Sequence, residues 1–453
     1  MENHMKWAFS TSMLLLTLLL NACSGDDNAF NNRGVAAQVQ FVNLIPNAPA
    51  LIFDLSGSSF ANVSYAQASG FQLVNLGTFQ ADVNYLNAAG TAEVDVFSTD
   101  DFATTSNREY SVMITGSLGS PTVTILDNLR AADIADGTSE IHFFNGSSLA
   151  SGVDIYLSEN TTEASINGLS PITLSINGST TLTTVDSGAR RMLVTASGDD
   201  TVIYDGGVVV LANQARRLFA VLDSFSVGGG VRMIQVGTVS ASGLIDERLR
   251  SRIRVANMVS DIAAVDVTLD GMSFLEDLAY QQVSGYTELD ADQYIIATTL
   301  TDQPAVVLHE NNRTLVSGDS RTLVVTGASV TGEVQGRFLF DNRRPVESVA
   351  QVRVINAAPD SGNLDVYIIS PDQLVTDAFV VPRLSNFTLL TNGLLMLEGG
   401  EYDVVFTAVG DETILVGPER VAITNGGIYS IIVSDADGGG APGEIVLADD
   451  FVQ

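Results

Sequence analysis

One pattern recurs four times along the chain and limits the fold more than any other feature. Each copy has an alternating apolar run, an asparagine, a corner of small residues and a second apolar run. The copies start at Val39, Glu140, Arg252 and Gln351. Their asparagines are Asn43, Asn145, Asn257 and Asn356, separated by 102, 112 and 99 residues. Because this period is too long for a solenoid repeat, the pattern predicts four copies of one domain.

Short runs rich in Val, Ile, Thr and Tyr fill each copy, and glycine-rich turn signals such as Asn425-Gly426-Gly427 separate them. A late apolar run also recurs, starting at Arg108, Ala215, Ser320 and Gly427. No long segment has a helical period. The predicted fold is all-β, with tandem Ig-like or transthyretin-like antiparallel β-sandwich domains behind a lipoprotein signal peptide.

The predicted boundaries follow from the repeat and its connectors. They are a signal peptide at 1–22, a polar tether at 23–38 and β-sandwich repeats at 39–127, 140–238, 252–340 and 351–450. We expect a short helical turn in the connector 239–251. The element Tyr65–Phe71 of copy 1 matches Tyr280–Tyr286 of copy 3, and we expect its divergent equivalents at 166–172 in copy 2 and 381–387 in copy 4.

The N-terminus has a cationic start, an apolar run from Met13 to Leu20 and then Asn21-Ala22-Cys23. The apolar run is too short to cross a bilayer and lies where a secretory signal does. The ending resembles the lipobox of bacterial lipoproteins, which implies lipid attachment at Cys23 and a membrane partner through that anchor. Ser24 after the cysteine implies, by the same resemblance, an outer-membrane destination on the periplasmic or cell-surface side.

The stretch 352–368, "VRVINAAPDSGNLDVYI", followed by "LEGGEYDVVFTA", is similar to the bacterial domain-of-unknown-function family 4397. Members of that family show an alternating strand, a small-Pro-Asp corner, a Val-Asp-Val-Tyr strand and a later Gly-rich turn. Copy 4 fits best, whereas copy 1 has Ile52 where the aspartate is expected. The resemblance extends over nearly all of the mature chain. It implies envelope or secreted β-domains and no established activity.

Three aspartates recur inside the second apolar run of their copies: Asp154, Asp266 and Asp365. One hypothesis is that they bind Ca²⁺ or act as acids. The favoured hypothesis is that each accepts hydrogen bonds from backbone N–H groups and fixes a turn. Calcium needs about six to eight oxygen ligands, and each copy offers few acids near this position. The glycine-rich stretch 434–444 lacks the glutamate that a calcium loop needs at its twelfth place.

Most catalytic chemistries lack their residues. The mature chain from Cys23 has no lysine or tryptophan, no cysteine other than the lipidated one, and only His142 and His309 as histidines. Neither histidine has a second one at metal-binding spacing. The stretch 317–321, "SGDSR", is better explained as a turn than as a nucleophile site. We therefore predict no catalytic residue, no cofactor and no metal ligand.

The net charge of −32 argues against nucleic acid as a partner, because phosphates require a basic footprint. The leading hypothesis is a non-catalytic envelope lipoprotein with a structural, binding or adhesion role, whose partner is an envelope protein or a glycan. One alternative is a hydrolytic or glycan-processing enzyme, which a compact arrangement with carboxylates converging in one pocket would favour. A second alternative is a stalk stiffened by calcium. Separate beads with shallow surfaces would favour the binding module.

Overall fold

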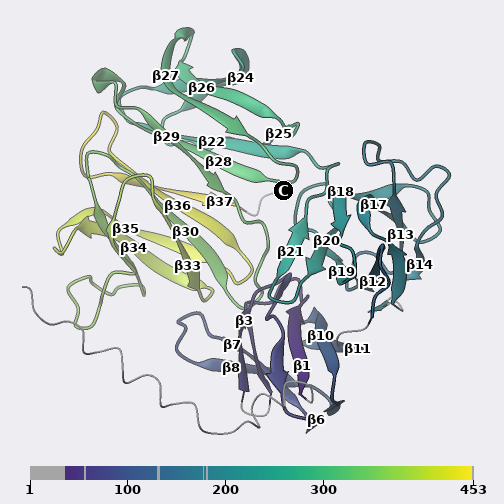
Figure 1. The fold of residues 1–453 in the computed structure, drawn as a ribbon. Coiled ribbons are helices and arrows are strands. Elements are labelled where there is room, and N and C mark those ends of the chain that lie inside the picture. The colour runs from purple at the N-terminus through teal and green to yellow at the C-terminus, as the bar shows by residue number, and fades with distance from the viewer. Residues whose placement is uncertain (1–35, 56–57, 130–132, 177, 180–181, 451–453) are drawn as a thin grey trace, which may run out of the picture.

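The computed structural model describes residues 36–55, 58–129, 133–176, 178–179 and 182–450. Within these ranges the chain forms strands β1 to β37 and one 3-10 turn, Ser329–Thr331, with no α-helix. The strands group into four successive units, each with two main sheets, here called units 1 to 4 (residues 37–129, 138–244, 251–340 and 350–449). The all-β class with tandem β-sandwich units is confirmed (Figure 1).

The strands of unit 1 are β1 (Ala37–Asn43), β2 (Leu51–Leu55), β3 (Ser58–Val63), β4 (Gln67–Ala68), β5 (Gln72–Val74), β6 (Gly77–Phe79), β7 (Ala81–Leu86), β8 (Glu93–Ser98), β9 (Phe102–Thr104), β10 (Arg108–Ser117) and β11 (Ser120–Leu129). Those of unit 2 are β12 (Thr138–Asn145), β13 (Val153–Ser158), β14 (Thr173–Ile176), β15 (Gly178–Ser179), β16 (Thr183–Asp186), β17 (Gly188–Ala196), β18 (Val202–Leu211), β19 (Ala215–Asp223), β20 (Val231–Val236) and β21 (Ala241–Leu244).

The strands of unit 3 are β22 (Ser251–Val259), β23 (Ala264–Leu269), β24 (Met272–Ala279), β25 (Thr287–Leu289), β26 (Gln293–Leu300), β27 (Gln303–Thr314), β28 (Ser320–Gly327) and β29 (Gln335–Phe340). Those of unit 4 are β30 (Ala350–Ala357), β31 (Leu364–Ile369), β32 (Leu384–Phe387), β33 (Asn392–Leu397), β34 (Gly400–Ala408), β35 (Ile414–Ile423), β36 (Ile428–Ser434) and β37 (Glu444–Asp449).

Each unit repeats one topology. The first sheet holds the first strand beside the late strand, in unit 4 with the order β33-β30-β36-β37, and the second sheet has the order β32-β31-β34-β35. The first and late strands run parallel in every unit, as β1 with β10, β12 with β19, β22 with β28, and β30 with β36. The sequence predicted antiparallel sandwiches. The parallel pairs show that this prediction was wrong for the first sheet of each unit. The crossover between the parallel strands contains the second sheet and one or two edge strands of the first, so the connection stays inside one unit.

Apolar residues fill the space between the two sheets of each unit, and a second set fills the space between units. In the late strand β19, Phe219 and Val221 point into the core of unit 2, while Leu218, Ala220 and Leu222 point toward unit 1. A strand buried on both faces needs an unbroken apolar run rather than an alternating one. This explains why the late runs of all copies are nearly continuous in hydrophobicity.

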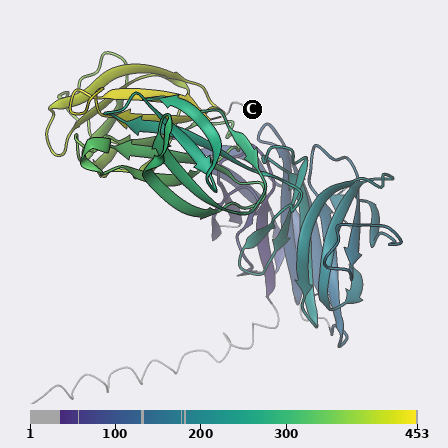
Figure 2. The same cartoon turned by 90° about the horizontal axis from the view of Figure 1, so that it is seen from above.

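The four units pack as two pairs rather than as separate beads. Units 1 and 2 share an apolar interface built around Met113, Phe144 and Leu218, and units 3 and 4 share one built around Met258 and Ile355. Figure 2 shows the two pairs side by side, purple with teal and green with yellow. The connector 239–251 contributes strand β21 to unit 2 and contains no helix, so the expected helical turn there was wrong. A strand forms because β20 offers a free edge to pair with.

Candidate functional site

The four repeat asparagines are buried where the first strand of each unit ends. In unit 4, the Nδ2 atom of Asn356 donates to the carbonyl oxygens of Gly362 and Phe387 at 2.9 Å each, and its Oδ1 atom accepts from the N–H of Ala358 at 3.0 Å. Phe387 belongs to the second sheet, so the amide joins the two sheets at the corner. Asn43 bonds Val63 and Ile45 in the same way; Asn257 bonds Leu278 and Val259; Asn145 bonds Ala150 and Ser147.

The three recurrent aspartates accept backbone N–H groups from neighbouring turns. Asp365 accepts from Asn386 at 2.7 Å and from Gly410 at 2.8 Å. Asp266 accepts from the N–H groups of residues 277 and 302, and Asp154 from that of residue 198. Each carboxylate lies in its own unit, so the structure does not bring the three together. Their geometry is that of side chains that fix turns.

The stretch 434–444, considered above as a calcium loop, also has a structural use. Asp435 accepts from the N–H of Asp360 at 3.0 Å and from the Ser361 hydroxyl at 3.0 Å, which closes the corner of unit 4. Burial raises the pKa of Asp435 above its ordinary value, against the lowering effect of these hydrogen bonds. Among the residues that the structure describes, no group of three or more His, Cys, Asp and Glu side chains could hold a metal ion.

Tyrosines of the odd units fasten the pairs. The Tyr65 hydroxyl of unit 1 donates to the carbonyl oxygen of Asp223 in unit 2 at 2.8 Å, and Tyr280 of unit 3 donates in the same way to Asp435 of unit 4. Both tyrosines open the matched elements seen in copies 1 and 3. These elements are therefore pairing elements, which explains why only the odd copies keep them.

A buried network of two arginines and two aspartates joins units 3 and 4. Arg254 of unit 3 pairs with Asp450 of unit 4, while Nη1 of Arg353 in unit 4 lies 2.6 Å from Oδ1 of Asp341 at the end of unit 3. Arg353 also reaches Asp450 at 3.1 Å. Each arginine stands three residues before the asparagine of its unit, so the crossed pairing relates equivalent positions of the two units.

Hydroxyl groups complete this network. Thr322 and Ser430 accept from the Nε atoms of the two arginines at 2.9 Å and donate to the two aspartates at 2.8 and 2.6 Å. The Tyr286 hydroxyl donates to Asp341 at 2.9 Å. A buried charge network of this kind is tolerated when its donors and acceptors are satisfied. We missed it in the sequence, although an arginine inside an otherwise apolar first strand in both copies 3 and 4 is a signal for it.

Units 1 and 2 meet through the same surfaces with uncharged groups. Gln40 and His142 take the places of the two arginines, three residues before their asparagines. The Gln40 amide donates to the Ser111 hydroxyl at 2.8 Å, and Nε2 of His142 lies 2.7 Å from Oδ1 of Asn128. His142 is thus an interface residue. Burial lowers the pKa of the other histidine, His309, which lies against Gly336.

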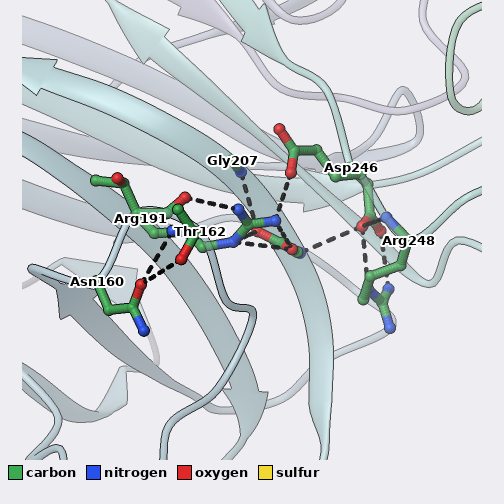
Figure 3. A network of polar contacts seen from close by, with 9 residues as sticks. Asn160, Thr162, Arg191, Gly207, Asp246 and Arg248 are labelled. Carbon is green, nitrogen blue, oxygen red and sulfur yellow. Dashed lines mark hydrogen bonds and ion pairs between the residues drawn. The ribbon is translucent and has the colours of Figure 1, made fainter.

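The connector from unit 2 to unit 3 is held on unit 2 by ion pairs, as Figure 3 shows. Nη2 of Arg191 lies 2.6 Å from Oδ2 of Asp205 and also pairs with Glu247 of the connector. Asp246 accepts the N–H of Asp205 at 3.2 Å and pairs with Arg248 at 2.8 Å. The hydrogen bond to Asp205 raises the pKa of Arg191 above its ordinary value. The connector is therefore a fixed part of unit 2.

The connector from unit 3 to unit 4 reaches back to unit 1. Nη1 of Arg344 donates to the carbonyl oxygens of Pro46 and Ala48 at 3.1 and 2.8 Å, and its guanidinium lies over the Tyr65 ring, 5.5 Å from the centroid. The preceding Arg343 lies over the ring of Tyr286 in unit 3 at 5.5 Å. Arg343 thus contacts unit 3 and its neighbour Arg344 contacts unit 1. Together they link the pair of units 1 and 2 to the pair of units 3 and 4.

A cavity of about 380 Å³ lies where the two connectors meet. Residues of units 1, 2 and 3 and of both connectors line it, including Tyr65, Arg232, Asp246, Asp319, Asp341 and Arg344. The expected serine turn 317–321 forms one wall, with Ser317 and Ser320 among the lining residues. This junction cavity is our candidate functional site, because it is the place where the units converge.

The carboxylates of the junction cavity do not form a catalytic pair. Asp246 is paired with Arg248, Asp319 with Arg321 at 2.6 Å, and Asp341 with an arginine of unit 4. The arrangement of the chain is compact, as the enzyme hypothesis required. Carboxylates also line one cavity, as that hypothesis required, but each is held in an ion pair with an arginine, which does not suit an acid or base role.

Two loops also differ from what the repeat predicts. Units 2 and 4 have long loops, 159–172 and 370–383, where unit 3 has only two residues, 270–271. The expected equivalents of the Tyr65 element, 166–172 and 381–387, were wrong for this reason. In unit 1 the N–H of Ala66 donates to the carbonyl oxygen of Asn43. In unit 4 the N–H of Leu390 makes the same bond to Asn356, so the insertion moves the equivalent of the Tyr65 element toward the C-terminus.

These features define a protein of tandem β-sandwich units that pack in two pairs around a common junction. The chain belongs to the DUF4397 family, a domain of unknown function, which matches residues 37–156 and 251–367, about half of the chain. The predicted family is confirmed, but the match is centred on units 1 and 3 and covers less than we expected. Each match ends in the second strand of the following unit, so it includes strands from both members of a pair.

Solved structures show distant similarity. The Bacillus anthracis TIE protein is 12% identical with a TM-score of 0.16, over 88% of this chain and 68% of that one. A family CBM26 module of Eubacterium rectale Amy13K, solved with maltoheptaose, is 13% identical with a TM-score of 0.16, over 44% of this chain and 96% of its own. A putative adhesin from Bacteroides ovatus is 12% identical with a TM-score of 0.15, over 46% and 95%.

At these TM-scores the similarities say nothing about what this chain binds. No curated protein matches the chain. The described ranges contain no helix that is long and apolar enough to cross a membrane. Cys23 and the signal segment lie outside the described residues.

Proposed function

We propose that this protein is a non-catalytic binding protein of the bacterial cell envelope. Acyl chains on Cys23 hold it at the outer membrane, and the paired units present the loops of units 2 and 4 to an envelope partner. The acyl chains supply membrane affinity. The paired units supply a rigid support, since both connectors are fixed by ion pairs or hydrogen bonds.

The observation that carries this proposal is the loop 370–383 of unit 4. Its base is held by Asp403, which accepts the N–H of Asp372 at 3.2 Å and pairs with Arg420 at 2.7 Å. Val375 packs in a small apolar cluster with Tyr367 on the outer side of the second sheet. The loop is therefore long but anchored, which is typical of binding loops on rigid scaffolds.

The tip of this loop exposes apolar side chains. Leu374, Phe379 and Val381 have 61%, 101% and 69% of their surface exposed. Phe379 also has a φ of 70°, in the left-handed region that bulky residues rarely adopt. An apolar tip held in a strained conformation is expected where a partner covers it.

Binding by the loop is tested with the purified chain and isolated envelopes. Replacing Leu374, Phe379 and Val381 together by Ser is expected to lower saturable binding at least tenfold, because the buried apolar contact is lost. The matched control is Val330→Ser, which changes an equally exposed valine of unit 3. Unchanged binding of the triple variant would contradict the proposal. Protease treatment of the envelopes distinguishes a protein partner from a glycan.

Anchoring is tested by labelling cells with radioactive palmitate and fractionating them. We expect the native chain to carry label in the outer membrane, and Cys23→Ala to be unlabelled and released from it. Ser24→Asp is the control, since it should keep the label while moving the protein to the inner membrane. A labelled Cys23→Ala chain, or an unlabelled native chain, would refute the lipid anchor.

A further inference from the structure

The charged side chains that line the junction cavity differ in whether they form ion pairs. Its three carboxylates, those of Asp246, Asp319 and Asp341, already have arginine partners outside the cavity lining. Arg232 and Arg344, by contrast, form no ion pair with any carboxylate among the described residues. Arg344 has neutral partners, two carbonyl oxygens and the Tyr65 ring.

Arginines without a carboxylate partner are unusual in a chain with 53 acidic and 21 basic residues, because acidic partners are abundant. Burial lowers the pKa of Arg344, and the nearby charge of Arg232 lowers it further. The two guanidinium groups are therefore close enough to repel each other. Both side chains are partly buried, and like charges withdrawn from water are costly unless an opposite charge joins them.

The local sequence makes room for Arg232. A side chain at residue 243 would place its Cβ 2.7 Å from Nη2 of Arg232, so the guanidinium lies directly over the backbone of β21. Gly243 is the residue type that this approach needs. The guanidinium thus lies at the wall of the cavity, and no ion pair among the described residues fixes it there.

The remaining lining fits a polar ligand with an apolar face. Hydroxyls of Ser224, Ser226 and Ser317 line the cavity, together with the rings of Tyr65 and Phe225, whose centroids are 5.8 Å apart at 79°. A guanidinium group matches a carboxylate through two parallel hydrogen bonds. Hydroxyls and ring faces suit the body of a sugar.

We propose that the junction cavity binds a small ligand through a carboxylate group held between Arg232 and Arg344. The carboxylate can belong to an acidic sugar or to a simple organic acid, and the hydroxyl-rich lining favours the sugar. Since the protein carries a net charge of −32, its overall field repels anions, and binding must come from these local groups. This site is independent of the loop 370–383.

The test is calorimetric titration of the whole mature chain with D-glucuronate, D-glucose, succinate and inorganic phosphate at equal ionic strength. Saturable binding is expected for glucuronate and not for glucose, which lacks the carboxylate. Binding of succinate as tight as that of glucuronate would assign the site to simple organic acids. Binding of phosphate alone, or of none of the four probes, would overturn the proposal.

Arg232→Gln is expected to weaken glucuronate binding at least about tenfold, because a charge-assisted hydrogen bond is lost. Arg250→Gln is the matched control, since it removes the same charge from an exposed position outside the lining of the cavity. Arg232→Lys keeps the charge but not the planar group, and it is expected to bind glucuronate with intermediate affinity. If the Gln variant does not fold, the Lys variant tests whether Arg232 binds the carboxylate. Native affinity in Arg232→Gln, or in Arg232→Lys when the Gln variant does not fold, would overturn the assignment.

Discussion

Replacing Asp450 by Ala is expected to destabilise the pair of units 3 and 4 by about 3–5 kcal/mol, the range found when one partner of a buried ion pair is removed. Asp450 accepts from Arg254, Arg353 and Ser430, and all of these side chains are buried. Burial is the largest single influence on the pKa of Arg254 and lowers it, but the charges of Asp450, Tyr286 and Asp341 together raise that pKa above its ordinary value. Without Asp450, two guanidinium groups would stay buried with one carboxylate between them. Urea unfolding followed by circular dichroism measures the loss.

Two further variants separate burial from charge. Glu288→Gln removes the partner of Arg252 in an exposed pair, with 44% of the Glu288 side chain accessible, and should cost less than about 1 kcal/mol. Replacing Arg254 and Arg353 by Met together with Asp341 and Asp450 by Leu should recover most of the stability, since apolar groups of similar volume can substitute for a buried network. A loss below about 1 kcal/mol for Asp450→Ala would show that the network is not closed as described.

Replacing Asn356 by Ala is expected to cost about 3 kcal/mol, because each buried group left without a partner costs about 1–3 kcal/mol. The change leaves the carbonyl oxygens of Gly362 and Phe387 and the N–H of Ala358 without the amide. It also removes a side chain that joins the two sheets at that corner. Thermal unfolding of the whole chain, read by differential scanning calorimetry, should show the transition of unit 4 moving to lower temperature.

Asn363→Ala is the control for this change, since Asn363 is exposed and its amide bonds only another exposed side chain, Asn386. Its expected cost is within about 0.5 kcal/mol. Asn257→Ala should resemble Asn356→Ala, because Asn257 makes the same two types of bond in unit 3. If Asn356→Ala and Asn363→Ala were equally mild, the asparagine would mark the repeat without holding its corner.

The repeat could be predicted from the sequence because its features are local. An apolar run with period two, an asparagine that bonds the residue two places on, and a glycine-rich turn each leave a signature within a few residues. The same local logic placed Asp365 at a turn rather than in an active site. It failed for the parallel ladder of β30 with β36 and for the insertions 159–172 and 370–383, because strand order and loop length depend on partners far away in the chain.

The pairing of units had a sequence signal that is clear only with the structure at hand. The late runs, such as "RRLFAVLD" at 216–223, are apolar on both faces, which an isolated sandwich with one solvated face does not need. The arginines at positions 254 and 353 are polar residues in buried strands, and each required a partner that the sequence alone could not identify. Arg254 pairs with Asp450, 196 residues further on, whereas Arg353 pairs with Asp341, 12 residues before it, and with Asp450, 97 residues after it.

The sequence by itself determined the repeated β-unit, its buried corners and the family, since hydrophobic period and turn chemistry are properties of short segments. Only the tertiary structure decided that the units pack in pairs, that both connectors are fixed, and that Arg232 and Arg344 meet in one cavity. Those outcomes depend on contacts between residues far apart in the chain, from Arg191 with Glu247, 56 residues apart, to Arg344 with Ala48, 296 residues apart. No local pattern specifies such a contact, because it is selected by the shape and charge of surfaces that exist only after each unit has folded.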